Sequence, residues 1–297
     1  MGKDTKILSL LPSATEICYL LGLEDNLVGV THECNWPKEA EAKPKVTGSV
    51  IPKGATPLEI DDIIRQAAKT NTLTQQIDLD KIRQLEPDII LTQDICKVCA
   101  VPKGHLTLAL EVLNIEAEII SLDPYSLDDV LQNILTVGSA TGRESQAAAL
   151  VTSFRSTLED LRNKDFPSPP PNMFALEWAN PPYSAGHWIP EMIEIAGAYP
   201  VCSVKNGNST RLDWDMIAGL EFDSVLFMPC GFQMEEVLSQ AKEILNHPAL
   251  AGAEKFYAAN AGGHFSRPGP RLIEGTVALS EVLRTGVSDD SIIRRIK

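Results

Sequence analysis

The sequence predicts an α/β protein with two doubly wound, mainly parallel lobes joined by a single long linker helix. Predicted strands alternate with predicted helices along the chain, which is typical of parallel sheets. A segment of fourteen residues also recurs, since residues 78–91 (DLDKIRQLEPDIIL) and 213–226 (DWDMIAGLEFDSVL) are identical at seven positions. Residues 126–162 have helical periodicity and contain no proline, so they predict one long helix between the lobes. We place the lobes at residues 1–124 and 166–297 and the linker at 125–165.

The first lobe is predicted to begin with a strand and a helix and then to alternate. Ser13 and Glu16 have the spacing of a capping box, and Gly22 follows the last apolar position of the same helix. The polar stretch 38–56 is rich in turn residues and predicts loops. In order, the elements are strand 6–11, helix 14–21, strand 27–30, helix 58–69, a helix beginning at Asp78, strand 89–92, helix 105–113 and strand 118–121.

The linker and the second lobe repeat much of this design. Ser126 and Asp129 have the spacing to cap the linker helix, while Gly138 and Gly142 can bend or divide it. A second echo supports the repeat, because EICYLLG at 16–22 resembles EMIEIAG at 191–197. The predicted elements are strand 173–176, helix 188–197, the second copy of the repeat, helix 233–245, strand 255–258 and helix 271–283.

Charge and hydropathy exclude several classes of partner. The formal net charge of −14 argues against nucleic acid and anionic membrane surfaces, because both would repel the protein at long range. No apolar run approaches the roughly 20 residues that a membrane-spanning helix needs. The N-terminal apolar run is short and ends at Pro12, so it predicts a strand rather than a signal peptide. We expect a monomer that is cytoplasmic as written, or extracytoplasmic if the sequence is a mature form.

Histidine and cysteine residues form one candidate metal site in the first lobe. His32 and Cys34 follow one predicted strand, and Cys96 and Cys99 follow another. The carboxyl ends of parallel strands meet at one edge of a sheet, where ligands commonly bind. A His-x-Cys loop and a Cys-x-x-Cys loop together make a plausible tetrahedral set for zinc or an iron–sulfur centre. The alternative is that these cysteines are small buried side chains that pack a cleft wall.

Loops of the second lobe predict a ligand-binding surface. His187 and His264 each lie in a loop that contains glycine and follows a predicted strand. Aromatic residues gather in the same predicted loops and suit the walls for a large, flat, partly apolar ligand; they are Trp36, Trp178, Tyr183, Trp188 and Phe265. The alternative is ordinary packing of aromatic side chains and surface histidines. The sequence contains no dinucleotide fingerprint, P-loop or nucleophile elbow, so we expect no enzyme activity.

Several long segments resemble one known family. SLLPSATEICYLLGLEDNLVGVTHECNWP, DIILTQDICKVCAV, ALEWANPPYSAGHWIPEM and GPRLIEG are similar to the cobalamin-binding subgroup of the substrate-binding proteins of ABC importers, a branch that also carries haem and iron–siderophore complexes. The resemblance implies two lobes joined by a long helix, with a corrinoid bound between them. It also implies that an acidic residue on each lobe docks onto a membrane permease, and the matching positions are Asp80 and Asp215.

The leading hypothesis is therefore a non-catalytic protein that binds cobalamin or another corrinoid. His187, His32 or a thiolate would supply an axial ligand to cobalt, the aromatic residues would cover the macrocycle, and polar groups including Asp94 and Arg271 would meet its amides. The second hypothesis is a zinc or iron–sulfur metalloprotein or redox protein built on the four His and Cys residues. A third is a receptor for haem or an iron–siderophore complex.

Overall fold

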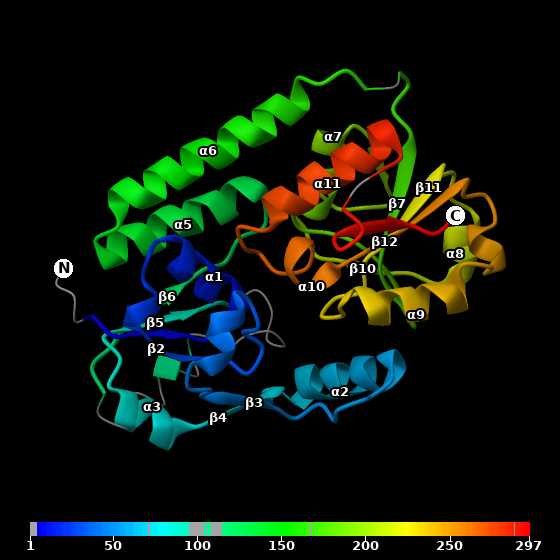
Figure 1. Cartoon of the computed structure of the whole chain (residues 1–297). Helices are drawn as coiled ribbons and strands as arrows, with labels where there is room; N and C mark the ends of the chain where they lie inside the picture. The colour runs from blue at the N-terminus through cyan, green and yellow to red at the C-terminus, as the bar shows by residue number, and fades with distance from the viewer. Residues whose placement is uncertain are drawn as a thin grey trace. The chain divides into compact units, whose positions relative to one another are not determined.

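The structure is a computed structural model that describes residues 5–70, 72–94, 104, 106–107, 115–166, 168–287 and 289–297. The chain divides into two compact units (Figure 1). Unit 1 comprises Met1–Pro124 and Leu131–Val151, and unit 2 comprises Tyr125–Val130 and Thr152–Lys297. Helices α5 (Leu127–Thr141) and α6 (Glu144–Arg162) each contribute residues to both units.

Within the described residues, unit 1 is built on a four-stranded parallel sheet in the order β2-β1-β5-β6. A small antiparallel pair, β3 with β4, was not predicted from the sequence. The core of the unit packs apolar side chains of β1 and β5 against α3, for example Leu8, Ile90 and Ile82. The elements are β1 (Ile7–Ser9), α1 (Pro12–Leu20), β2 (Leu27–Val30), β3 (Thr47–Ser49), α2 (Pro57–Thr70), β4 (Gln75–Ile77), α3 (Leu79–Leu85), β5 (Ile89–Thr92) and β6 (Glu118–Ser121), with 3-10 turns at Glu24–Asn26 and Lys38–Ala42.

Unit 2 contains a seven-stranded sheet in the order β10-β8-β7-β11-β12-β13, with β9 also paired to β7. Its central strands β7, β11 and β12 are parallel, while β8, β10 and β13 run antiparallel to their neighbours. The elements are β7 (Asn172–Ala179), β8 (Pro182–Ser184), α7 (Ile189–Ala196), β9 (Tyr199–Val201), β10 (Thr210–Arg211), α8 (Trp214–Ala218), β11 (Ser224–Phe227), α9 (Met234–Ile244), a 3-10 turn (Pro248–Leu250), β12 (Lys255–Ala259), α10 (Ala261–His264), α11 (Leu272–Thr285) and β13 (Ile293–Arg295).

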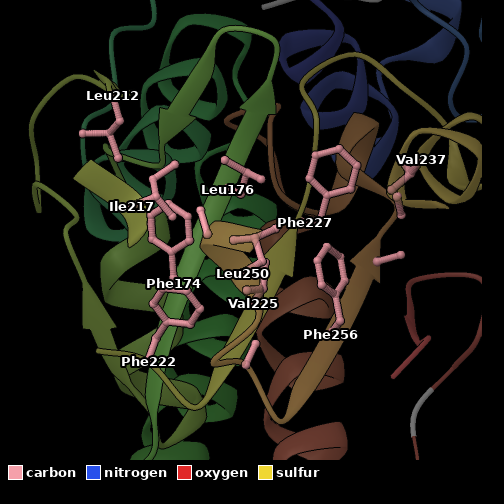
Figure 2. Close-up of a cluster of buried hydrophobic side chains, with 14 residues drawn as sticks. Phe174, Leu176, Leu212, Ile217, Phe222, Val225, Phe227, Val237, Leu250 and Phe256 are labelled. Carbon is pink, nitrogen blue, oxygen red and sulfur yellow. The ribbon is translucent and has the colours of Figure 1, made fainter. Parts of the chain in front are cut away.

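Aromatic side chains from the three central strands fill one core of unit 2 (Figure 2). The ring centroid of Phe174 on β7 lies 5.5 Å from that of Phe222. Phe227 on β11 and Phe256 on β12 lie 6.3 Å apart in a tilted arrangement. All but Phe222 are almost completely buried, so each contributes a large apolar area to stability. This core holds the parallel strands β7, β11 and β12 together.

The internal repeat begins in the same way in both units. The side chain of Asp78 accepts a hydrogen bond from the backbone N–H of Lys81, at 2.9 Å, and starts α3. The side chain of Asp213 accepts from the N–H of Met216, at 2.7 Å, and starts α8. An acidic N-cap satisfies a backbone donor that a helix leaves unpaired. The prediction of an acid-capped helix in each copy is therefore confirmed.

The repeat also ends in the same way. The carboxylate of Asp88 accepts a hydrogen bond from the backbone N–H of Lys6, at 2.7 Å, and so joins the start of β5 to the start of β1. The carboxylate of Asp223 accepts from the N–H of Asn172, also at 2.7 Å, and joins β11 to β7. Two copies of one helix, turn and strand therefore make equivalent contacts with equivalent neighbouring strands.

The expected single linker helix is wrong, because residues 127–162 form two helices, α5 and α6. Gly142 between them adopts φ of +69°, a left-handed conformation that ends a helix. The N–H of Arg143 donates to the carbonyl of Gly138, at 2.7 Å, and closes the turn. Gly138 lies so close to Ala147 that a side chain would not fit there. The predicted cap of the first of these helices is confirmed, because Ser126 and Asp129 donate and accept reciprocally.

The predicted capping box at Ser13 is also wrong. Helix α1 begins at Pro12, its N-cap is Leu11, and no side chain caps it. Ser13 and Glu16 lie inside the helix and are buried. Proline is well suited to the first helical position, because its missing N–H has no partner there in any case. No helix in the described part of the chain is both long enough and apolar enough to cross a membrane.

Asp223→Ala tests the contact that joins β11 to β7. The substitution leaves the N–H of Asn172 without its acceptor, so we expect a loss of about 1 kcal/mol in the free energy of unfolding. Urea denaturation measures it. The matched control is Glu221→Ala, an exposed acid two residues earlier, which should change stability by less than about 0.5 kcal/mol. Equal effects of the two substitutions would contradict the role given to Asp223.

Candidate ligand-binding site

Two loops of unit 2 are fastened to one another. The N–H of His187 donates to the carbonyl of Gly207, at 2.5 Å, and the N–H of Asn206 donates to the carbonyl of His187, at 3.0 Å. Gly186 is packed against the backbone of residues 207–209, where a Cβ atom would collide. We call residues 185–188 and 206–209, together with Glu177, the His187 cradle.

His187 is the most constrained residue of the cradle. Its φ of +54° is unusual for a residue other than glycine. Its ring stacks on Tyr125, with centroids 5.8 Å apart, and lies 5.4 Å from the ring of Trp188. Burial lowers the pKa of His187, and a hydrogen bond to the side chain of Asn208 only partly opposes this effect. The imidazole is therefore neutral at pH 7.

A partly buried acid supports the same two loops. Glu177 lies near the carboxyl end of β7, and its Oε2 accepts a hydrogen bond from Ser209 Oγ, at 2.5 Å. Burial raises the pKa of Glu177, while its hydrogen bonds from Ser209 and from the backbone of Gly186 oppose the rise. The carboxyl group thus connects both loops of the cradle to β7. Sequence reasoning missed Glu177, although an acid in the otherwise apolar run ALEWA was an available signal.

The aromatic residues predicted to line the site divide into two groups. Trp188 is 6% exposed and Phe265 is fully buried, and Trp188 Nε1 donates to the carbonyl of Phe265, at 2.7 Å. These rings therefore pack the interior of unit 2. Trp178 on β7 lies opposite Tyr183 on β8, and both remain partly exposed. Trp178 also contacts the ring of Phe232, with centroids 5.6 Å apart.

His264 and Arg271 serve the packing of α10 on α11. His264 is buried, and its Nε2 lies 3.4 Å from Glu274 Oε2. The hydrogen bond from His264 lowers the pKa of Glu274, against a smaller effect of burial. The guanidinium of Arg271 lies directly against Gly263, and Gly275 lets α11 approach the backbone of His264. Neither side chain belongs to the His187 cradle.

The predicted metal site in unit 1 is only partly described. His32 Nδ1 lies 2.7 Å from Thr47 Oγ1 and its Nε2 lies 3.4 Å from Glu33 Oε1. Burial lowers the pKa of His32, with smaller and opposed effects of Glu33 and Lys45. Cys96 and Cys99 lie outside the described residues, as does most of the predicted helix 105–113. Among the residues that are described, no group of three or more His, Cys, Asp or Glu side chains could hold a metal ion.

Cys34 has a different environment from His32. Its side chain is buried, and its Sγ lies 3.1 Å from Thr15 Oγ1 on α1. Burial, with a contribution from Cys34, raises the pKa of Cys18 on the same helix to about 12. Cys18 is therefore a protonated thiol rather than a thiolate at neutral pH. The environment of Cys34 fits the alternative of a small buried side chain that packs the interior.

The remaining predicted residues are near the surface. Trp36 is partly exposed and precedes a cis peptide bond to Pro37. Asp94 is exposed, and its N–H donates to Asp123 Oδ1, at 2.5 Å. Asp80 and Asp215 occupy the second positions of α3 and α8, and both are exposed.

The chain belongs to the periplasmic binding protein family, whose profile matches residues 7–260. This family has the two-lobe α/β fold. Among solved structures, the periplasmic vitamin B12 binding protein BtuF of Vibrio cholerae is 20% identical with a TM-score of 0.67, covering 94% of this chain and 96% of its own. The periplasmic heme binding protein HutB of Vibrio cholerae is 19% identical with a TM-score of 0.69, covering 94% and 98%.

Two of the curated relatives match shorter parts of this chain than the solved structures do. A substrate-binding lipoprotein of an ABC transporter, the uncharacterized YvrC of Bacillus subtilis, is 29% identical over 161 residues, which are 54% of this chain and 41% of YvrC. A vitamin B12-binding protein of Vibrio cholerae is 26% identical over 196 residues, which are 65% and 59% of the two chains. The chain thus spans about half the length of these relatives. A vitamin B12-binding protein of Vibrio vulnificus is 24% identical over 90% of this chain and 86% of its own length.

Gly186→Ala tests whether the close approach of the two loops stabilises unit 2. The added methyl group would meet the backbone of residues 207–209, so we expect a loss of about 1–3 kcal/mol in the free energy of unfolding. Gly252→Ala is the matched control, because nothing lies near a Cβ atom at that position. Urea denaturation of both variants measures the difference, and equal stabilities would show that the loops are not held by this contact.

Proposed function

We propose that this protein is the extracytoplasmic substrate-binding protein of an ABC importer and that its substrate is a corrinoid of the cobalamin type. The observation that carries the proposal is membership of the periplasmic binding protein family over residues 7–260, combined with relatives that are named as vitamin B12-binding proteins. The protein would capture and release its substrate without chemical change.

Two features of unit 2 support a metal-bearing macrocycle as the substrate. The cradle offers a neutral imidazole at His187, and neutral imidazole is the form that binds cobalt and iron. Trp178, Tyr183 and Tyr125 keep part of their rings exposed, which suits contact with a large, partly apolar surface.

Haem is the second candidate substrate. It is favoured by the same neutral imidazole at His187, because haem iron also takes a histidine ligand. Structural neighbours named as haem-binding proteins are as similar in fold as the vitamin B12-binding protein. The corrinoid is preferred because the curated relatives named for a ligand bind vitamin B12.

Titration with cyanocobalamin and with haemin tests the substrate. We expect saturable one-site binding of cyanocobalamin with a Kd of about 1 μM or lower, and weaker binding of haemin. Equilibrium dialysis measures both, and quenching of tryptophan fluorescence provides a second readout. Trp178→Ala should weaken binding about tenfold, whereas Trp214→Ala, on α8, should leave it unchanged. If only haemin binds, haem and not a corrinoid is the substrate. If neither ligand binds, the proposed function is wrong.

We further propose that Asp80 and Asp215 dock onto basic residues of the membrane permease. Both are exposed and occupy equivalent positions of the internal repeat. The double substitution Asp80→Lys and Asp215→Lys should abolish uptake of labelled cobalamin by cells that depend on this protein, while the Kd in solution stays unchanged. The control pair Asp25→Lys and Glu235→Lys reverses two other exposed acids. Normal uptake by the Asp80 and Asp215 variant would exclude this docking surface.

A further inference from the structure

We propose that His187 coordinates the metal of the bound macrocycle through the ring nitrogen that does not contact Asn208. This inference rests on the proposed function, because it assumes that the substrate is a metal-bearing macrocycle. It goes further by naming the coordinating atom and by requiring that the metal have an exchangeable axial position. It is argued from the backbone conformation of His187 and from the partners of its ring, all of which belong to unit 2. A comparison with the other described histidines then follows.

The backbone of His187 is held in an unfavourable conformation. Its φ of +54° lies in the left-handed region, which side chains rarely adopt unless surrounding contacts enforce it. Two hydrogen bonds, one with Gly207 and one with Asn206, enforce it here. Such conformations gather at ligand-binding positions, where they fix the direction of one side chain. The unfavourable backbone conformation of His187 is therefore maintained by the fold, and it fixes the position of the imidazole.

The ring of His187 also has a defined orientation and tautomer. The side chain of Asn208 is hydrogen-bonded to one ring nitrogen and favours its protonation, so that nitrogen donates an N–H. The other nitrogen then carries a lone pair. Metal-binding histidines are oriented in this way, by an acceptor that is hydrogen-bonded to the N–H of the opposite ring nitrogen. The rings of Tyr125 and Trp188 lie next to the imidazole and restrict its rotation.

The other described histidines lack such a nitrogen. His32 contacts Thr47 with one nitrogen and Glu33 with the other. His247 accepts a hydrogen bond from Ala249 at Nδ1, so its proton is on Nε2. In His264, Nε2 faces Glu274, and Nδ1 is buried with no partner. Because that Nδ1 is inaccessible, a bulky macrocycle could not reach it. His187 thus stands apart from the other histidines of the described chain.

The coordination step is a ligand exchange with no change of oxidation state. The lone pair of the free imidazole nitrogen of His187 forms a bond to the metal, and the metal–oxygen bond to an axial water breaks. The water leaves with both of its protons, and the opposite ring nitrogen keeps its proton and its hydrogen bond to the side chain of Asn208. A macrocycle with an axial water can therefore be coordinated, whereas one with a tightly held axial cyanide cannot.

The decisive variant is His187→Asn, because asparagine tolerates a left-handed backbone and lacks the imidazole. The probes are aquocobalamin, whose axial water exchanges, and cyanocobalamin, whose cyanide resists exchange. We expect aquocobalamin to bind the unaltered protein about 10- to 100-fold more tightly than His187→Asn, and cyanocobalamin to bind both equally. His247→Asn is the matched control and should bind both probes like the unaltered protein. Asn208→Ala should weaken aquocobalamin binding selectively.

A spectroscopic readout identifies the bond directly. In the cobalt(II) form of the complex with aquocobinamide, a corrinoid that lacks the nucleotide base and therefore has no axial nitrogen of its own, replacing histidine nitrogen with ¹⁵N should change the axial nitrogen splitting of the electron paramagnetic resonance spectrum from triplets to doublets. The change should be absent in His187→Asn. If both cobalamins bind but the splitting does not respond to the label, the coordination by His187 is wrong and the proposed function stands. If neither cobalamin binds, both fail.

Discussion

One carboxylate contact at the start of the central strands recurs in both units. The carboxylate of Asp88 accepts a hydrogen bond from the N–H of Lys6, and that of Asp223 accepts one from the N–H of Asn172. Each contact therefore joins two neighbouring parallel strands at their amino ends. The register that follows pairs Ile7 with Ile89 in unit 1 and residue 173 with 224 in unit 2. A slip of one residue would exchange the two faces of a strand. These contacts therefore support the register in which each pair of strands places its apolar side chains in the core.

The two units share a design but differ after their first strand. In unit 1, β1 leads within three residues into α1. In unit 2, β7 is longer and turns back through β8 before α7 begins. Helices α1 and α7 nevertheless end alike, with Gly22 and Gly197 in left-handed conformations. The added hairpin is what carries Glu177 on one strand and delivers His187 after the other. The His187 cradle therefore depends on a hairpin that unit 2 has and unit 1 lacks. The elements that the two units share form the sheet to which this hairpin is paired.

The sequence predicted much of this fold because its periodic elements are long and their caps are specific. The repeat, both acidic caps and the parallel strands follow from local pattern. The division of the linker depends on the left-handed conformation of Gly142, and pattern alone does not decide whether a glycine bends or ends a helix. Trp188 and Phe265 are predicted as walls of a ligand site, with ordinary packing as the alternative, and both are buried, because burial depends on tertiary neighbours that a local pattern does not reveal. Glu177 and Ser209 are far apart in sequence, and only the fold brings them together. Cys96 and Cys99 stay predictions, since they lie outside the described residues.

The central proposal is that unit 2 presents a preformed cradle to a metal-bearing macrocycle. The most direct test is a crystal structure of the protein grown with aquocobalamin, with anomalous scattering recorded at the cobalt absorption edge. We predict one cobalt peak within bonding distance of the imidazole of His187, with residues 206–209 in the same backbone conformation as in the ligand-free protein. A corrin bound with its cobalt remote from His187 would contradict the coordination, and crystals without cobalt under saturating ligand would contradict the assigned substrate.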